Sequence, residues 1–198
     1  METVLLIWIL IIAGTVLLDQ ISKLLVAAFL DRDQPFDLIK GVFRFSYVEN
    51  DGAAFGSFDD SRWVFMIAST VLIIGLFIYL WKFRPESKLA CVSMSMIIGG
   101  GIGNMIDRIR LGYVIDFLDF CAFPNLWKWV FNIADAFVCV GCGMLCLWCI
   151  ISTVKEYKEE KLKKQAAGTE AVDESAKEAE STNDENIEEQ TEEKAEEK

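Results

Sequence analysis

The most informative absence in this chain of 198 residues is histidine, which does not occur at all. Without histidine, Ser-His-Asp triads, Cys-His proteases and His-ligated zinc sites are not first-choice mechanisms. Any chemistry must therefore depend on Asp, Glu, Lys, Ser, Cys, backbone groups or water.

The C-terminal part of the chain contains almost no apolar residues after Leu162. Residues 155–198 hold 16 acidic and 8 basic residues, a net charge of −8, whereas the first 154 residues carry −3. Such a segment cannot bury enough surface to offset its ordering entropy, so we predict a disordered, charged cytoplasmic tail over 155–198. Its negative charge repels nucleic acid, so we expect no nucleic-acid partner.

The rest of the chain is strongly apolar, and it contains four long apolar runs, at about 4–28, 63–81, 89–106 and 130–151. A helix needs about 20 mostly apolar residues to cross a membrane. The first run resembles a secretory signal sequence, but it lacks a basic leader and a small-residue cleavage site, so we interpret it as a span. The pattern predicts a mainly α-helical, polytopic membrane domain over 1–154, built as a four-helix transmembrane bundle.

Basic residues near the ends of the spans predict the orientation of the chain. The short loop 82–88, KFRPESK, has three basic residues in seven, and five lysines follow the fourth span. These two regions lie on the same side of a four-span protein, so we expect both termini to be cytoplasmic. The loops 31–61 and 107–129 are then the outer loops.

The first outer loop contains an alternating pattern in which Phe43, Phe45 and Tyr47 are separated by polar residues. Alternation with period two is typical of a half-buried strand. We therefore predict a small extracytoplasmic β-sheet formed from residues 31–61.

Several charged residues near the spans have simple structural interpretations. Asp19 and Lys23 are four apart, so they share a helix face and can pair. Asp107 directly precedes Arg108, and we interpret it as a member of a structural ion pair. We expect Asp119 to face solvent.

Asp116 and Asp135 are different, because each lies in an apolar segment, VIDFL or NIADAFV, with no basic residue three or four positions away. Two carboxylates brought together in a partly dry site do not both ionise, since like charges push one pKa upward. The ionised group can then take a proton from water while the protonated group donates to a carbonyl or a leaving amine. The pair is a candidate for hydrolysing a peptide bond.

Five short motifs between residues 15 and 150 carry a resemblance to a known family. They are DQISK at 19–23, NDGAAFG at 50–56, GGGIGNMIDR at 99–108, VIDF at 114–117 and FNIAD at 131–135. In this order and on four spans, they resemble the lipoprotein signal peptidases, also called signal peptidase II. The resemblance implies a cofactor-free intramembrane aspartyl endopeptidase with no metal, whose catalytic residues are Asp116 and Asp135.

The resemblance also implies a substrate, a location and supporting residues. The substrate is a prolipoprotein with diacylglycerol on a cysteine, cleaved just before that cysteine at the outer face of the bacterial cytoplasmic membrane. Membrane lipid is the other expected partner, and we expect a monomer. Four residues match positions that line the site and orient the dyad: Asn50, Asn104, Arg108 and Asn132. Asp19 and Lys23 match positions that secure the outer sheet to the first helix. A close turn beside the cleft is implied for Gly52, Ala53, Ala54 and Phe55.

Two other patterns suggest sites that we interpret as packing. Four cysteines at 139, 142, 146 and 149 step along one helix face over about 15 Å, and one helix cannot wrap thiolates so placed around a single ion. We expect them to act as small apolar packing residues. The glycines at 99, 100, 101 and 103 favour close approach of neighbouring helices rather than a phosphate-binding loop.

Two alternative functions remain open at this point. A small proton-coupled transporter would use the carboxylates as a proton relay, and polar residues would then be spread across the membrane depth. Here they gather at one end of the spans, and residues 63–81 contain no charge. A non-catalytic membrane adaptor would act through its tail and would not need matching motifs in its core.

Overall fold

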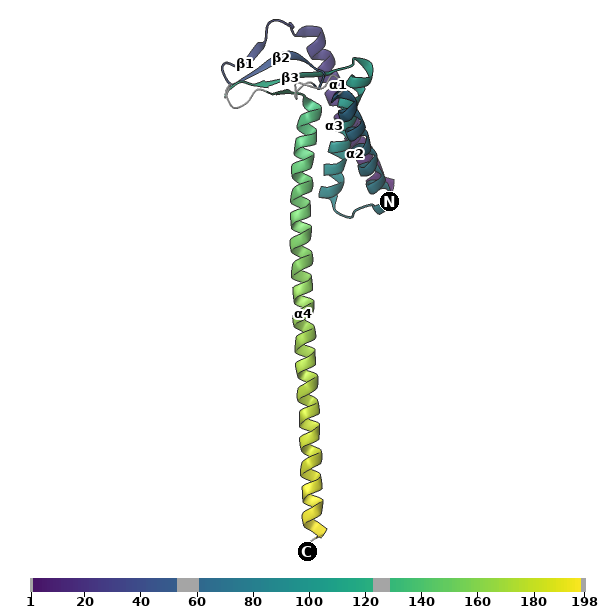
Figure 1. Cartoon of the computed structure of the whole chain (residues 1–198), viewed down its shortest axis with the longest axis vertical. Coiled ribbons are helices and arrows are strands. Elements are labelled where there is room, and N and C mark those ends of the chain that lie inside the picture. The colour runs from purple at the N-terminus through teal and green to yellow at the C-terminus, as the bar shows by residue number, and fades with distance from the viewer. Residues whose placement is uncertain (1, 53–60, 123–128, 197–198) are drawn as a thin grey trace. The chain divides into compact units, whose positions relative to one another are not determined.

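The computed structural model describes residues 2–52, 61–122 and 129–196 (Figure 1). Its long helices are α1 (Glu2–Phe29), α2 (Ser61–Phe83), α3 (Lys88–Arg110) and α4 (Ile133–Glu196). Each contains a stretch that is long and apolar enough to cross a membrane. The predicted polytopic helical fold with four spans is therefore confirmed.

The strands form one antiparallel sheet in the order β1-β2-β3-β4. They are β1 (Phe36–Ile39), β2 (Phe43–Asn50), β3 (Val114–Phe120) and β4 (Val130–Phe131). The strands predicted in the first outer loop are confirmed as β1 and β2. The second outer loop adds β3 and β4, which the sequence pattern did not predict, because residues 114–117 of β3 are all buried and so show no polar alternation.

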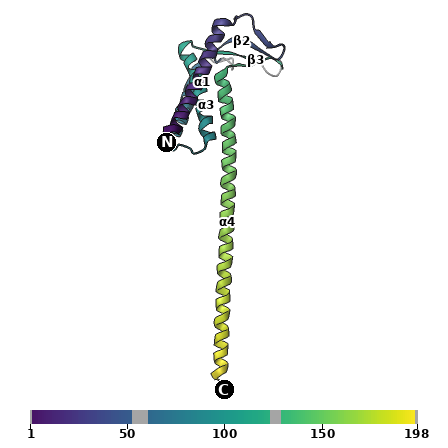
Figure 2. The same ribbon diagram turned by 180° about the vertical axis from the view of Figure 1, so that it is seen from behind.

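The sheet lies across one end of the helices, as both views show (Figures 1 and 2). The C-terminal ends of α1 and α3 and the N-terminal end of α4 meet there. This arrangement brings β3 next to the first turn of α4, and these two elements carry Asp116 and Asp135.

Glycines in α3 allow its neighbours to approach closely. A Cβ atom at Gly100 would lie 2.5 Å from the carbonyl oxygen of Ala134, at the start of α4. A Cβ atom at Gly103 would lie 2.5 Å from an Asp19 carboxylate oxygen on α1. Since any larger residue would push these helices apart, the structure confirms that the glycines serve helix packing.

The C-terminal segment differs from the prediction. Helix α4 continues to Glu196, whereas the charge pattern had led us to expect a disordered tail over 155–198. Glu, Lys and Ala are strong helix formers, and pairs four apart, Lys155–Glu159 and Glu160–Lys164, add local support. Residues 155–164 are exposed, as expected for a solvated segment. Cys149–Lys198 forms a compact unit separate from Met1–Trp148.

Candidate active site

The two candidate catalytic carboxylates are joined through a single residue, Asn132. Its side-chain Nδ2 donates a hydrogen bond of 2.6 Å to Asp116 Oδ1 on β3. Its backbone N–H donates a hydrogen bond of 3.2 Å to Asp135 Oδ2 in the first turn of α4. Asp116 and Asp135, 19 positions apart in the sequence, are therefore brought to one site.

Asp135 is oriented by the start of its own helix. The backbone N–H of Asp135 donates to Asn132 Oδ1 at 2.9 Å, while the Asp135 carboxylate accepts from the Asn132 backbone N–H. This reciprocal pattern is a capping box, in which the residue before the helix and the third helical residue satisfy each other's free N–H groups. A carboxylate in this first turn is also favoured by the helix dipole. The segment FNIAD thus fixes Asp135 locally.

A second amide reaches each carboxylate from another element. Asn50, at the end of β2, donates from Nδ2 to Asp116 Oδ2 at 2.8 Å. Asn104, in α3, donates from Nδ2 to Asp135 Oδ1 at 2.7 Å. Each carboxylate therefore accepts two N–H donors, and all four come from Asn50, Asn104 and Asn132.

The surroundings of the two carboxylates are unequal. Asp116 is 2% exposed, whereas Asp135 is partly exposed. Burial raises the pKa of Asp116 to about 6, and the nearby charge of Asp135 adds to this rise, while the hydrogen bonds from Asn50 and Asn132 oppose it. Asp116 therefore keeps a proton to a higher pH than an ordinary carboxyl group.

The other predicted site residues lie nearby. Arg108 lies in the last turn of α3, and its Nη1 donates to the Asn104 carbonyl oxygen at 3.4 Å. Its positive charge also interacts with Asp135 and Asp116. Gly52 has φ of 89°, and its N–H donates to Asn50 Oδ1 at 3.0 Å. Ala53, Ala54 and Phe55 lie outside the described residues.

The predicted pair of Asp19 and Lys23 is confirmed, with Nζ and Oδ2 2.9 Å apart and both side chains buried. Lys23 also pairs with Asp107 Oδ2 at 2.9 Å. The partner of Asp107 is thus Lys23 rather than its neighbour Arg108, because the Asp107 side chain points toward α1. Asp107 also connects these ion pairs to the sheet, because its Oδ2 accepts a hydrogen bond of 3.3 Å from the Ile115 backbone N–H of β3.

The sequence interpretation missed Gln20, although it lies inside the motif DQISK. Gln20 Nε2 donates to Asp107 Oδ1 at 2.9 Å and to the Gly103 carbonyl oxygen at 3.1 Å. It therefore helps to hold α1 against α3 beneath the site. The only sequence signal was its position between Asp19 and Lys23.

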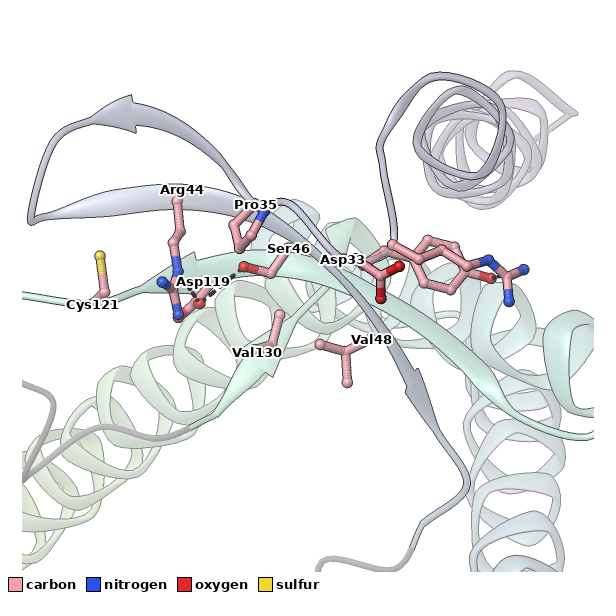
Figure 3. A pocket seen from close by; sticks show the side chains of 10 residues that line it. Asp33, Pro35, Arg44, Ser46, Val48, Asp119, Cys121 and Val130 are labelled. Atoms are coloured by element: carbon pink, nitrogen blue, oxygen red, sulfur yellow. Dashed lines mark hydrogen bonds and ion pairs between the residues drawn. The ribbon is translucent and has the colours of Figure 1, made fainter.

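Asp119 was expected to face solvent, and that expectation is wrong. Its side chain is 13% exposed and forms an ion pair of 2.6 Å with Arg44 Nε, which raises the pKa of Arg44. Ser46 Oγ also donates to Asp119 at 3.1 Å. These side chains line a hollow of about 440 Å³ on the sheet, together with Val48, Cys121 and Val130 (Figure 3). Neither Asp116 nor Asp135 lines it.

The cysteines of α4 do not pack as expected. Cys139, Cys142, Cys146 and Cys149 are all exposed and form no disulfides, so they do not pack against other helices as the small apolar packing residues that we expected. Over the described residues, no group of three or more Cys, Asp or Glu side chains is arranged to hold a metal ion.

Comparison with known proteins identifies the family. The profile described as Signal peptidase (SPase) II matches residues 11–151, more than half of the chain. The chain belongs to the signal peptidase II family. It is thus an aspartic endopeptidase of the signal peptidase II type, as the five motifs predicted, and the transporter and adaptor alternatives are not supported.

This chain aligns with most of the length of several lipoprotein signal peptidases. The lipoprotein signal peptidase of Caldanaerobacter subterraneus subsp. tengcongensis is 45% identical over 137 residues, 69% of this chain and 91% of the relative. That of Halothermothrix orenii is 44% identical over 133 residues, 67% of this chain and 88% of the relative.

Solved structures agree with this assignment. A bacterial membrane enzyme solved by the in meso method at 2.3 Å is 28% identical, with a TM-score of 0.66, over 74% of this chain and 88% of that chain. A second such structure, at 1.9 Å, has the same identity and TM-score and covers 72% of this chain and 91% of its own. The fold of this signal peptidase II family member is therefore similar to the fold of these two solved bacterial membrane enzymes.

Proposed function

We propose that this chain removes signal peptides from prolipoproteins whose cleavage-site cysteine already carries diacylglycerol, cutting just before that cysteine. The lipoprotein substrate is supported by the names of its relatives. The observation that carries the proposal is the shared bonding of Asp116 and Asp135 by Asn132, since a peptide bond can be hydrolysed by two carboxyl groups that share a proton.

The unequal surroundings of the two carboxyl groups assign their roles. Asp135 is partly exposed, so it takes a proton from a water molecule, whose oxygen attacks the scissile carbonyl carbon. Asp116 is buried and holds its proton to about pH 6, so it donates that proton to the carbonyl oxygen. As the tetrahedral intermediate collapses, Asp135 gives the proton taken from water to the leaving nitrogen, the C–N bond breaks, and Asp116 recovers its proton from the hydroxyl group. The products are a free carboxyl group on the signal peptide and a free amino group on the lipidated cysteine.

Arg108 supplies a positive charge beside this chemistry. Its guanidinium interacts electrostatically with both carboxylates and has a fork of N–H donors. We assign it to a backbone carbonyl or an ester oxygen of the substrate, next to the scissile bond. Asn50 donates a hydrogen bond to Asp116, and the Gly52 N–H in turn donates to Asn50 and holds its amide in place.

The proposed reaction takes place at the membrane, which determines how the substrate reaches the site. Because the substrate's signal helix and acyl chains prefer lipid, the substrate enters from the bilayer. The basic residues of loop 82–88 and the lysines after the fourth span support a cytoplasmic location for both termini. The sheet end of the helices, with the site, then lies at the outer face.

The test is cleavage of a diacylglyceryl-modified precursor by the purified protein in the presence of a chelator. We expect cleavage just before the lipidated cysteine, and much slower cleavage of the same precursor without lipid. Asp116→Asn and Asp135→Asn should each lower kcat by about 10³-fold or more, because removal of an acid or base catalyst costs about 10² to 10⁴.

Asp119→Asn is the matched control, because Asp119 lies on the same strand as Asp116 but forms its ion pair with Arg44 in the separate hollow. It should retain kcat within about threefold, because Arg44 is 40% exposed, so water screens the charge left without its partner, and the pair makes no bond to the dyad. Near-normal cleavage by a folded Asp116→Asn or Asp135→Asn variant would reject the dyad, and indifference to the lipid would reject the substrate class.

A further inference from the structure

The side chain of Lys23 is the centre of a buried network below the site. It is 2% exposed, and an ammonium group has three N–H donors. Three acceptors lie within hydrogen-bond distance of Nζ: Asp19 Oδ2 at 2.9 Å, Asp107 Oδ2 at 2.9 Å and Asn104 Oδ1 at 2.8 Å. Every donor of this lysine is therefore used, on two different helices.

Two of these acceptors lead to the backbone immediately before the two catalytic carboxylates. Asp19 Oδ1 accepts from the backbone N–H of Ala134 at 2.9 Å, and Ala134 directly precedes Asp135. Asp107 Oδ2 accepts from the backbone N–H of Ile115 at 3.3 Å, and Ile115 directly precedes Asp116. One ammonium group thus connects the start of α4 with the start of β3.

The third acceptor leads to the Asp135 side chain. Asn104 Oδ1 accepts from Lys23 Nζ at 2.8 Å and from Asn132 Nδ2 at 3.0 Å. Since both of these groups are donors, the oxygen end of the Asn104 amide must face them. Its Nδ2 is then the end that donates to Asp135 Oδ1 at 2.7 Å. Lys23 and Asn132 together therefore determine which end of the Asn104 amide meets the Asp135 carboxylate.

We propose that Lys23 is a positioning residue for peptide cleavage, which sets the separation of Asp116 and Asp135 through Asp19, Asp107 and Asn104. It touches neither the substrate nor the reacting atoms. The inference rests on the proposed function, because it assumes that the two carboxylates act as the dyad. It differs from the role of a clasp between the outer sheet and the first helix, because the three bonds of Lys23 converge on both members of the dyad.

Energetics favour positioning over stability as the reason for this network. Buried ion pairs are often no more stabilising than apolar side chains of similar volume, because their desolvation cancels the attraction. A cluster with three fully buried charges at 0 to 2% exposure is therefore poorly explained by stability alone. Fixed geometry is what such a cluster supplies, and catalysis depends steeply on geometry.

The main test is the triple variant Asp19→Asn, Lys23→Met, Asp107→Asn. It removes all three charges together, so it leaves no unpaired buried charge, and each new asparagine oxygen can still accept from Ala134 or Ile115. Cleavage of the diacylglyceryl precursor should show kcat lower by about 100-fold with KM within about threefold, because a misplacement of about 1 Å costs that much. The milder variant Asp107→Asn keeps the pair of Lys23 with Asp19 and should lower kcat by about tenfold.

The matched control is the double variant Arg44→Met, Asp119→Asn, which removes the ion pair of 2.6 Å between β2 and β3. It should leave kcat within about twofold. The proposal is overturned if the folded triple variant keeps the kcat of the unmodified protein or changes only KM. If the triple variant does not accumulate, unchanged kcat in Asp107→Asn overturns it equally.

The same assay separates this proposal from the function on which it rests. Inactive Asp116→Asn and Asp135→Asn variants beside fully active Lys23 network variants would leave the function standing and remove only the positioning role. Active Asp116→Asn and Asp135→Asn variants would remove the proposed function itself.

Discussion

Two ion pairs with the same sequence spacing differ in their burial: one is buried in the protein and the other is exposed. Asp19–Lys23 in α1 and Lys155–Glu159 in α4 are both pairs of residues four apart on a helix. The first is 2.9 Å long with side chains 0 and 2% exposed, whereas the second is 3.9 Å long with side chains 77 and 55% exposed. Because the sequence spacing is identical, the difference in distance and in bonding between the two pairs follows from their burial.

The physical reason is the dielectric surroundings of the charges. Water screens an exposed pair, which is worth about 0 to 1 kcal/mol. Inside the protein, a charge must find partners for all its hydrogen-bonding groups, and loss of one partner leaves an uncompensated charge. The buried region therefore tolerates little change, while the exposed helix after Trp148 tolerates much.

The single substitution Lys23→Met should have the largest effect on stability. It leaves the carboxylates of Asp19 and Asp107 buried without their cation, which costs about 3 to 5 kcal/mol of unfolding free energy. Denaturant titration of the purified protein in detergent measures this loss. A loss below about 1 kcal/mol would show that burial does not separate the two regions in this way.

The stability of the protein should depend on pH through Asp116. Its pKa in the folded state is raised to about 6, above the ordinary value of 3.8, so its stabilising proton is fully bound below about pH 4 and is lost as the pH rises through 6. The decline amounts to about 3 kcal/mol at most, from about 1.4 kcal/mol per pKa unit. Unfolding titrations from pH 4 to pH 7 should show this slope in the unmodified protein and a weaker slope in Asp116→Asn. Equal slopes in both would contradict the raised pKa.

Gly103→Ala should disturb the buried region by sterics alone. The added Cβ atom would lie 2.5 Å from Asp19 Oδ2, so the buried Asp19 side chain must move from its partners, at a cost of about 1 to 3 kcal/mol. Gly143→Ala is the control, because no atom lies within 4 Å of a Cβ atom there. It should be neutral or stabilising by up to about 1 kcal/mol through helix propensity. Equal melting temperatures for the two variants would argue against the close contact.

Lys155→Met should have the smallest effect. It removes the exposed pair with Glu159, and the unfolding free energy should change by less than about 0.5 kcal/mol. Cleavage of the precursor should be unchanged as well. A loss comparable to that of Lys23→Met would mean that the two pairs do not differ as their exposure indicates.

The amino-acid sequence was sufficient to predict several parts of this structure. The four spans follow from the length of the apolar runs, and β1 and β2 follow from alternation around Phe43 and Phe45. Asp116 and Asp135 stood out because each is a carboxylate in an apolar segment without a nearby basic residue. The capping box of Asn132 and Asp135 is likewise local, since both residues lie within four positions.

Other features were not readable from the sequence. β3 shows no alternation, because both faces of residues 114–117 are buried. The structural ion pair expected of Asp107 is confirmed, but its partner is Lys23 of another helix rather than the neighbouring Arg108, because successive residues on a helix point about 100° apart. Asp119 was placed in solvent because its partner, Arg44, is 75 positions away. The tail was predicted as disordered from its charge, whereas its helix-forming residues continue α4.

The sequence by itself determined the local properties of this signal peptidase II family member: which segments are apolar enough to enter a membrane, and which residues can take part in chemistry. Only the tertiary structure decided how those residues meet. Asp116 is bonded by Asn50 and Asn132, and Lys23 joins α1 to α3 below the site, through contacts that span up to 84 positions. Such contacts depend on how helices pack, and packing depends on side-chain shape across the whole fold rather than on any local pattern.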